Sequence, residues 1–361
     1  MMQLRDLLPH EIPNAALEDI VTKVQIQSDF TITHADYQPL KLADEIVVSL
    51  QNLPIEIQNR YLNLQLRNFL YGIYYNGQLK ATLANNVNPD SLLEIKKLEN
   101  NQAGAFNREF YEDLQKSNCG KGYFDPRWLV VKQESDHLLA VQKDDLTLHI
   151  EPERYLQLAE QSANVGDEVA VLMPPNLIEQ AYYVAVSDAG LVNKTLAVNI
   201  NFNFISEGAI ALMKSLTQQL NEINIPFTFK VLYDPDNYQR CDCGVLQFES
   251  HNYHIVKQIL QTVYIANKCL FRDLVPLFTK LLAPGLSLAE EPNNKFTDQE
   301  NFGMNRCRIL ANALLEAWQE GDNSQQGKMH YVDRHFSQHL IDLQRPYLNA
   351  NSEDIYPMLD C

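Results

Sequence analysis

The sequence predicts an α+β fold, with a helical N-terminal region over residues 1–120 and a mixed, largely antiparallel sheet flanked by helices over residues 121–361. In the first part apolar residues recur every three or four positions, which is the spacing of amphipathic helices. After Gly120-Lys121-Gly122 the pattern changes to short runs rich in β-branched and aromatic residues. The connections between these runs are too short for regular crossover helices, so we expect neighbouring strands to run antiparallel.

The N-terminal region contains four predicted helices. The first covers residues 15–24, and a longer one covers residues 55–75. Asn76-Gly77 ends the long helix, because glycine readily adopts the left-handed conformation of a helix cap. Two shorter helices are expected over residues 91–100 and 106–116.

The sequence of the second region predicts several strands first, followed by alternating helices and strands. Short strands are expected at residues 128–131, 138–142, 146–150, 168–173, 181–186 and 195–202. Ser206 is the predicted N-cap of a helix that leads into a central strand at residues 227–232. The remaining elements are a strand at 245–248, an extended segment at 274–282 before the Pro284-Gly285 turn, and helices over residues 256–264, 305–318 and 324–340.

The composition indicates a globular, water-soluble protein. Of the 361 residues, 45% are hydrophobic and 21% charged, which suffices for a large core. The formal charge of −17 argues against nucleic acid and anionic membranes as partners. No run of eighteen apolar residues occurs, and the first residues lack the apolar segment of a signal peptide, so we expect a cytoplasmic protein. The six cysteines lack the dense spacing of a secreted disulfide framework.

Two groups of residues suggest a metal site, and neither has the usual spacing. Cys241 and Cys243 precede His251 and His254, but one intervening residue is fewer than the two to four of a zinc knuckle. A zinc-supported structural module therefore remains a weak alternative. His335 and His339 share a helical face without the glutamate of a metalloprotease. No phosphate-binding loop or serine nucleophile elbow is present, and we expect no metal and no cofactor.

Basic residues beside apolar segments are the more informative feature. Lys230 lies in the middle of the central strand, where an ammonium group needs an anion, a buried partner or a wet cleft. Other basic residues adjoin apolar or aromatic segments in the same way: Lys214, Arg240, Lys280 and Arg306. They are either cations paired with acids such as Asp242, Glu290 and Glu291, or the walls of a phosphate or carboxylate pocket.

Several long segments resemble the HopA-type effector family of type III secretion systems. These are the segment from Phe202 to Leu220, Pro226-Phe227-Thr228-Phe229-Lys230, residues 276–292 and Phe302-Gly303-Met304-Asn305-Arg306-Cys307. Residues 60–77 and 122–131 are similar to free-standing bacterial members of the same family. The resemblance therefore covers nearly the whole chain, and it identifies residues 121–361 as a HopA-like α+β domain.

The resemblance implies a kinship with phosphothreonine lyases, which convert phosphorylated Ser or Thr to a dehydroamino acid by β-elimination. By this resemblance Lys230 is the candidate base, while Arg240, Lys280 and Arg306 are candidate phosphate ligands together with Lys214. Asp242 and Glu290 would orient them. The implied partner is a phosphorylated peptide or protein, in a pathway that includes a kinase-like protein.

One position departs from the lyase pattern. Leu232 stands where these enzymes carry a histidine, two residues after the lysine. A general acid would then have to come from elsewhere, and His149 or Tyr238 are the candidates. The alternative function is a noncatalytic, effector-like interaction protein that binds a phosphorylated or acidic partner in a basic cleft. Secretion as an effector is compatible with either function.

Overall fold

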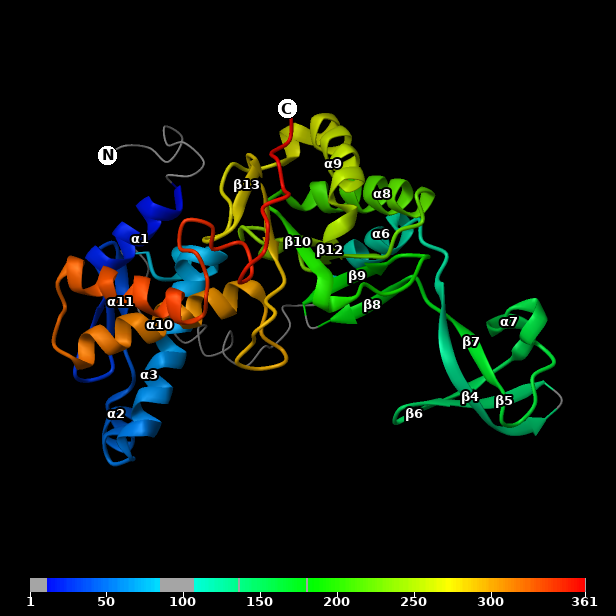
Figure 1. Ribbon diagram of the computed structural model, residues 1–361, viewed down its shortest axis with the longest axis horizontal. Helices are drawn as coiled ribbons and strands as arrows, with labels where there is room; N and C mark the ends of the chain where they lie inside the picture. Colours follow the sequence, from blue (N-terminus) through cyan, green and yellow to red (C-terminus); the bar gives the residue numbers. More distant parts are fainter. Residues whose placement is uncertain (1–11, 85–106, 136, 180, 361) are drawn as a thin grey trace.

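A computed structural model describes residues 12–84, 107–135, 137–179 and 181–360 and confirms the predicted α+β fold (Figure 1). Every strand pair in this part of the chain is antiparallel, as expected from the short connections. No helix within these residues is both long enough and apolar enough to span a membrane.

The main sheet has seven strands in the order β13-β14-β10-β12-β11-β9-β8. Their bounds are β8 (Asn176–Glu179), β9 (Tyr182–Val186), β10 (Ala197–Phe202), β11 (Phe227–Leu232), β12 (Gly244–Glu249), β13 (Lys280–Ala283) and β14 (Leu286–Glu290). The strand that carries Lys230 is β11, which lies inside the sheet between β12 and β9, as predicted. Strand β14 was not predicted. All five of its residues are buried, so it shows no alternation between polar and apolar side chains.

One face of the main sheet packs against α8 (Ser206–Glu222), α9 (Tyr253–Asn267) and α6 (Arg108–Ser117) (Figure 1). Phe202 and Phe229 meet on this face with ring centroids 5.5 Å apart. Ser206 was predicted to be the N-cap of α8, and this prediction is wrong. The cap position is Ile205, and the Ser206 hydroxyl donates instead to Glu207.

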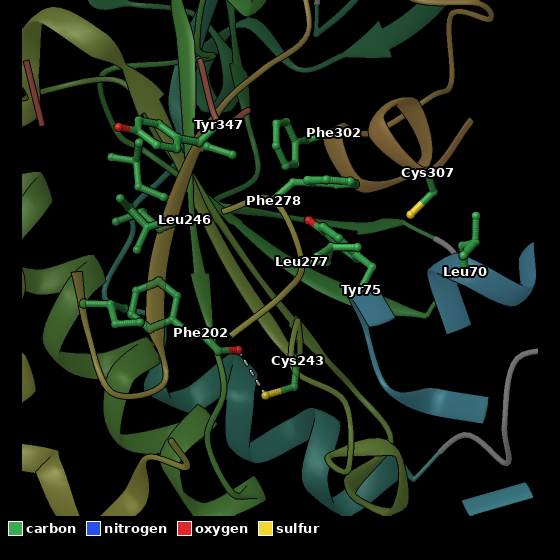
Figure 2. Packing of buried hydrophobic residues seen from close by; sticks show 14 of the residues in the cluster. Leu70, Tyr75, Phe202, Cys243, Leu246, Leu277, Phe278, Phe302, Cys307 and Tyr347 are labelled. Atoms are coloured by element: carbon green, nitrogen blue, oxygen red, sulfur yellow. Dashed lines mark hydrogen bonds between the residues drawn. The ribbon is translucent and has the colours of Figure 1, made fainter. Parts of the chain in front are cut away.

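The opposite face packs against α3 (Ile55–Leu70), the π-helical turn η2 (Tyr71–Tyr75) and α10 (Phe302–Gln319). Figure 2 shows Tyr75, Phe278 and Phe302 on this side of the sheet and Phe202 and Leu246 on the other. Gly303 permits the close contact between α10 and η2, because an added Cβ would lie 2.5 Å from the Tyr75 ring. The sheet is therefore buried between two helical layers.

The N-terminal region packs onto the C-terminal helices. α1 (Ile12–Lys23) lies beside α11 (Gln325–Gln338), and Lys328 Nζ donates to the Val24 carbonyl at 2.8 Å. The long N-terminal helix ends at Gly77 as predicted, with φ of +77°. Ser324, the predicted start of the last helix, is the N-cap of α11 and accepts from the Gly327 amide at 3.0 Å. The region also contains α2 (Asp44–Gln51) and α4 (Gln78–Thr82).

The N-terminal region is not purely helical, because it also forms a small sheet of β1 (Gln25–Ile26), β2 (Ile32–His34) and β3 (Tyr37–Leu40). Strands of two to four residues are too short for a recognisable alternation. The helix predicted over residues 91–100 lies outside the described residues.

A second sheet projects from the main body with the order β6-β5-β4-β7 (Figure 1). Its strands are β4 (Tyr123–Ser135), β5 (Leu138–Lys143), β6 (Leu146–Ile150) and β7 (Glu168–Met173), and α7 (Pro152–Tyr155) packs on β7. This sheet has its own apolar core around Trp128, whereas the N-terminal helices share one core with the main sheet.

Candidate functional site

Lys230 extends from β11 on the side of the sheet opposite Phe229, because successive side chains of a strand alternate between its faces. Its Nζ lies 5.7 Å from the centroid of the Tyr182 ring and 3.9 Å from the Glu179 carboxylate. The Lys230 side chain is 35% exposed and Glu179 is 55% exposed, so this ion pair is loose and solvated.

Arg240 reaches the same tyrosine from the loop after β11. Its guanidinium forms a bidentate pair with Asp242 at 2.8 and 2.9 Å, and Nη2 also donates to the Tyr182 hydroxyl at 2.9 Å. Burial opposes the charge of Arg240, but Asp242 and Tyr182 raise the pKa of Arg240 well above its ordinary value. Arg240 therefore stays charged, and Asp242 largely neutralises it.

Tyr182 connects the two cations. Its ring lies 5.9 Å from Arg240 Cζ as well as near Lys230, and its hydroxyl oxygen accepts from Arg240. Burial raises the pKa of Tyr182, so the hydroxyl keeps its proton. A tyrosine oxygen that accepts one hydrogen bond can still donate its own proton to a ligand.

Asp242 is held from behind by a second tyrosine. Tyr71 of η2 donates to Asp242 at 3.3 Å, and the Tyr71 oxygen accepts from Asn301 at the N-cap of α10. Burial and then Asp242 raise the pKa of Tyr71, which therefore acts as a neutral donor. We call Lys230, Tyr182, Arg240 and Asp242 the Lys230 site. Its residues come from β9, β11 and the loop that follows β11.

Lys280 and Lys214 do not join this site. Lys280 lies on β13, four strands from β11, which at about 4.8 Å per strand is roughly 19 Å. It forms an ion pair with Asp354 at 2.6 Å. Lys214 is exposed on α8, which covers the other face of the sheet. Lys280 and Lys214 were expected to lie beside Lys230, and the structure places both of them elsewhere.

Arg306 and Glu290 lie together, away from Lys230. Arg306 is buried in α10 and donates to the carbonyls of Pro346 and Leu348 at 2.8 and 3.0 Å. Glu290 ends β14, three strands from β11, and accepts from the Asn349 amide at 2.7 Å. Of the expected phosphate ligands in the described residues, only Arg240 contacts the tyrosine that lies beside Lys230. Of the expected orienting acids, only Asp242 pairs with Arg240.

Neither candidate acid faces Lys230. His149 is exposed on β6 in the second sheet, where Nδ1 lies 2.8 Å from Glu134. Tyr238 is buried and donates its proton to the Leu232 carbonyl at 2.5 Å, while burial raises the pKa of Tyr238. The tyrosine that lies beside Lys230 is Tyr182 instead. Sequence reasoning missed it because residues 181–186 were interpreted only as a sheet-forming run.

The cysteines of the suggested zinc module have other partners. Cys243 Sγ donates to the Phe202 carbonyl at 3.3 Å, as Figure 2 shows, and to the Phe204 carbonyl at the same distance. Burial raises the pKa of Cys243 to about 12. Burial likewise raises the pKa of Cys241 to about 11. No group of three or more His, Cys, Asp or Glu side chains suited to a metal ion occurs in the described ranges.

Comparisons with known proteins match the main sheet and its helices. Residues 173–348 match the HopA1 effector protein family. The solved effector protein of Pseudomonas syringae pv. syringae strain 61 is 13% identical, with 69% of this chain and 84% of that chain covered and a TM-score of 0.41. The effector protein of Pseudomonas syringae pv. tomato strain DC3000 is 17% identical, with 67% and 81% covered and a TM-score of 0.41. No curated protein sequence matches the chain. The residues that are similar to the HopA1 effector protein family, 173–348, contain all seven strands of the main sheet.

Proposed function

We propose that this effector-like protein binds a phosphorylated or acidic partner protein through the Lys230 site. The observation that carries the proposal is the convergence of Lys230 and Arg240 on one tyrosine, at 5.7 and 5.9 Å from its ring centroid. Lys230 is partly exposed and only loosely paired, so its ammonium is available to an anion.

A phosphoryl group suits this arrangement better than a single carboxylate. Its oxygens can accept from the Lys230 ammonium and the Tyr182 hydroxyl at the same time. Arg240 contributes a charge fixed by Asp242, and its Nη1 group has no protein partner among the described residues. A dianionic phosphate would compete easily with Glu179 for Lys230, since Glu179 lies 3.9 Å away and is more exposed than the lysine.

A second candidate function is β-elimination at the same site, and the position of Tyr182 favours it. In its neutral form Lys230 would remove the Cα proton of a phosphothreonine or phosphoserine. The electron pair of the Cα–H bond forms the Cα=Cβ double bond, and the electron pair of the broken Cβ–O bond leaves with the phosphate. Tyr182 would donate its proton to the departing phosphate, the role for which Leu232 leaves no histidine.

Phosphothreonine peptides separate the two functions. Peptide affinity is measured by calorimetry, and mass spectrometry detects the loss of phosphoric acid, about 98 Da. We expect wild-type protein to bind the phosphorylated peptide more tightly than its unphosphorylated form, and Lys230→Ala to weaken binding about tenfold. Lys214→Ala is the matched control and should bind as wild type, because Lys214 lies across the sheet.

The mass readout then assigns the chemistry. A loss of about 98 Da that Lys230→Ala abolishes would establish elimination, whereas binding without mass loss supports recognition alone. Equal affinity for phosphorylated and unphosphorylated peptides, without any mass change, would refute both functions.

A further inference from the structure

A second polar cavity lies beside α10, separate from the Lys230 site. It has a volume of about 310 Å³ and is bounded by the first turns of α10, the residues just after α11, and the segments 293–294 and 349–351. Arg306, His339 and five asparagines provide its polar lining. Its volume is at the lower end of the range for small-molecule pockets.

Arg306 is the buried charged residue of this cavity lining. Its side chain is 1% exposed, and its three hydrogen-bond acceptors are neutral: the carbonyls of Pro346 and Leu348 and the side-chain oxygen of Asn305. No carboxylate within the described residues pairs with it, unlike Arg240 with Asp242. A guanidinium has five N–H groups, so three bonds leave donors for a further acceptor.

The unpaired charge of Arg306 needs an explanation beyond packing. Burying an ion without a counter-ion is costly, and burial lowers the pKa of Arg306 to about 10, opposed by Glu290 and Glu300. The charge is therefore best explained by an anion that enters the cavity.

The remaining lining is also suited to an anion. In a chain with 46 acids against 29 lysines and arginines, no acidic residue belongs to the described cavity lining. Burial, followed by His335 and Arg306, lowers the pKa of His339, so its ring is neutral at pH 7 and can donate one hydrogen bond. The side-chain amides of Asn305 and Asn349 bond within the protein. The further neutral donors and acceptors of the lining are therefore the amides of Asn293, Asn294 and Asn351.

We propose that this cavity is a binding site for a small organic anion, carrying a carboxylate or a phosphate, whose charged group contacts Arg306 while His339 and the exposed asparagines of the lining, Asn293, Asn294 and Asn351, bind its other polar atoms. The site is distinct from the Lys230 site, so one protein could hold a phosphorylated partner and a small ligand at once. Carboxylate and phosphate share the acceptor chemistry that a guanidinium recognises.

The test uses the full chain, inorganic phosphate and acetate. Each anion is titrated by calorimetry up to about 10 mM, while the ring signals of His339 are followed by NMR. We expect at least one of the two anions to bind and to shift the His339 signals saturably. The anion that binds more tightly identifies the tetrahedral or the planar group as the natural one.

Variants localise the binding without disturbing the core. Arg306→Gln removes the charge but endangers folding, so Asn294→Asp is the main variant, because it adds an acid at an exposed residue of the lining. It should weaken anion binding about tenfold or more. Asn193→Asp makes the same charge change at an exposed asparagine outside the cavity and should leave the affinity unchanged.

Lys230→Ala separates this proposal from the function proposed above. The anion affinity that is read from the His339 shifts should be the same in Lys230→Ala as in wild type. Binding lost in Lys230→Ala but retained in Asn294→Asp would place the anion at the other site and overturn the proposal. Absence of any His339 shift up to about 10 mM would overturn it as well.

Discussion

At the scale of single residues, neighbouring groups shift the pKa of Arg240 and the pKa of Arg306 in opposite directions. Both are buried, which disfavours the charged form. A carboxylate in bidentate contact raises the pKa of Arg240, whereas Arg306 has only neutral hydrogen-bond partners and a pKa lowered to about 10. Arg240 has a carboxylate as its counter-ion within the protein, and no ion pair of Arg306 occurs in the described residues.

Tyr182→Phe tests the role of the tyrosine that links Lys230 and Arg240. The change removes one hydrogen bond to Arg240, so we expect a loss of about 1 kcal/mol in the free energy of unfolding, measured in urea. Phosphopeptide affinity should fall only a few-fold, since both cations remain, and any elimination should be abolished.

Tyr183→Phe is the matched control on the same strand. Its hydroxyl accepts from Asn118, and the side chain points to the opposite face of the sheet. A comparable loss of affinity in both variants would show that Tyr182 acts through the stability of β9 rather than through the site.

The sequence predicts some of these residues and not others, for a physical reason. Lys230 stands out within its own strand, and Arg240 and Asp242 lie two positions apart, so local patterns suffice. Tyr182 reaches them only because β9 pairs with β11, which are separated by more than forty residues. A contact across the sheet has no local signal in the sequence.

At the scale of elements, residues 346–360 bind the edge of the main sheet. The Leu359 amide donates to the Leu282 carbonyl of β13, and the Glu290 amide of β14 donates to Tyr347. Lys280 and Tyr347 both bond to Asp354 at 2.6 to 2.8 Å. This segment therefore covers an edge that would otherwise present unpaired backbone groups.

Asp354→Asn should loosen that segment in a pH-dependent way. Burial raises the pKa of Asp354, but hydrogen bonds from Lys280 and Tyr347 lower it by more, to below its ordinary value of 3.8. Because the pKa of Asp354 is lower in the folded state, its carboxylate stabilises the fold fully at pH values above the unfolded-state pKa of 3.8. This stabilisation is lost as the pH falls through the folded-state pKa. At pH 7 we expect the free energy of unfolding of the wild type, measured in urea, to be about 1–2 kcal/mol larger than that of the variant.

The difference between the two proteins should shrink on acidification below pH 4, as Asp354 becomes protonated in the wild type. A difference that stays constant from pH 7 to pH 3 would show that the carboxylate charge contributes nothing and that only the shape of the side chain matters.

Sequence patterns predict long elements better than short ones in this protein. The helices α3, α8, α10 and α11 were expected near their true bounds, because a period of 3.6 residues repeats several times within each. Strands β1 and β2 are too short to show a period, and β14 is buried on both faces. The burial of β14 depends on helices that are distant in the sequence.

At the scale of the whole molecule, the apolar residues form two separate cores, and these do not divide at residue 120. One core extends from Leu17 in α1 through the main sheet to Leu359, and the other lies within the second sheet. The fold class was predictable from composition and periodicity. The packing of α3 on α10 was not, since it joins segments such as Asn63 and Asn312, whose side chains bond at 2.6 Å.

Trp128→Ala tests whether the second sheet opens independently. Trp128 is 2% exposed in the smaller core, and its removal should cost that sheet about 3–5 kcal/mol. In hydrogen exchange monitored by mass spectrometry, we expect faster exchange in β4 to β7 and unchanged exchange in β10 to β12.

Phe229→Ala in the main core is the converse experiment, because Phe229 packs against Phe202 between the helices and the sheet. It should speed exchange in the main sheet and the N-terminal helices together. If either variant accelerates exchange in both sheets equally, the molecule unfolds as one cooperative unit.

The covered edge of β13 also sets an order of events during synthesis on the ribosome. Leu359, which bonds to that edge, is translated after all seven strands of the main sheet. At about 5–20 residues per second, the edge waits several seconds for its partner, and during this time a neighbouring nascent chain can pair with it. Slow translation or crowded polysomes should therefore favour misassembly at this edge, and a chaperone that shields it would act before Leu359 emerges.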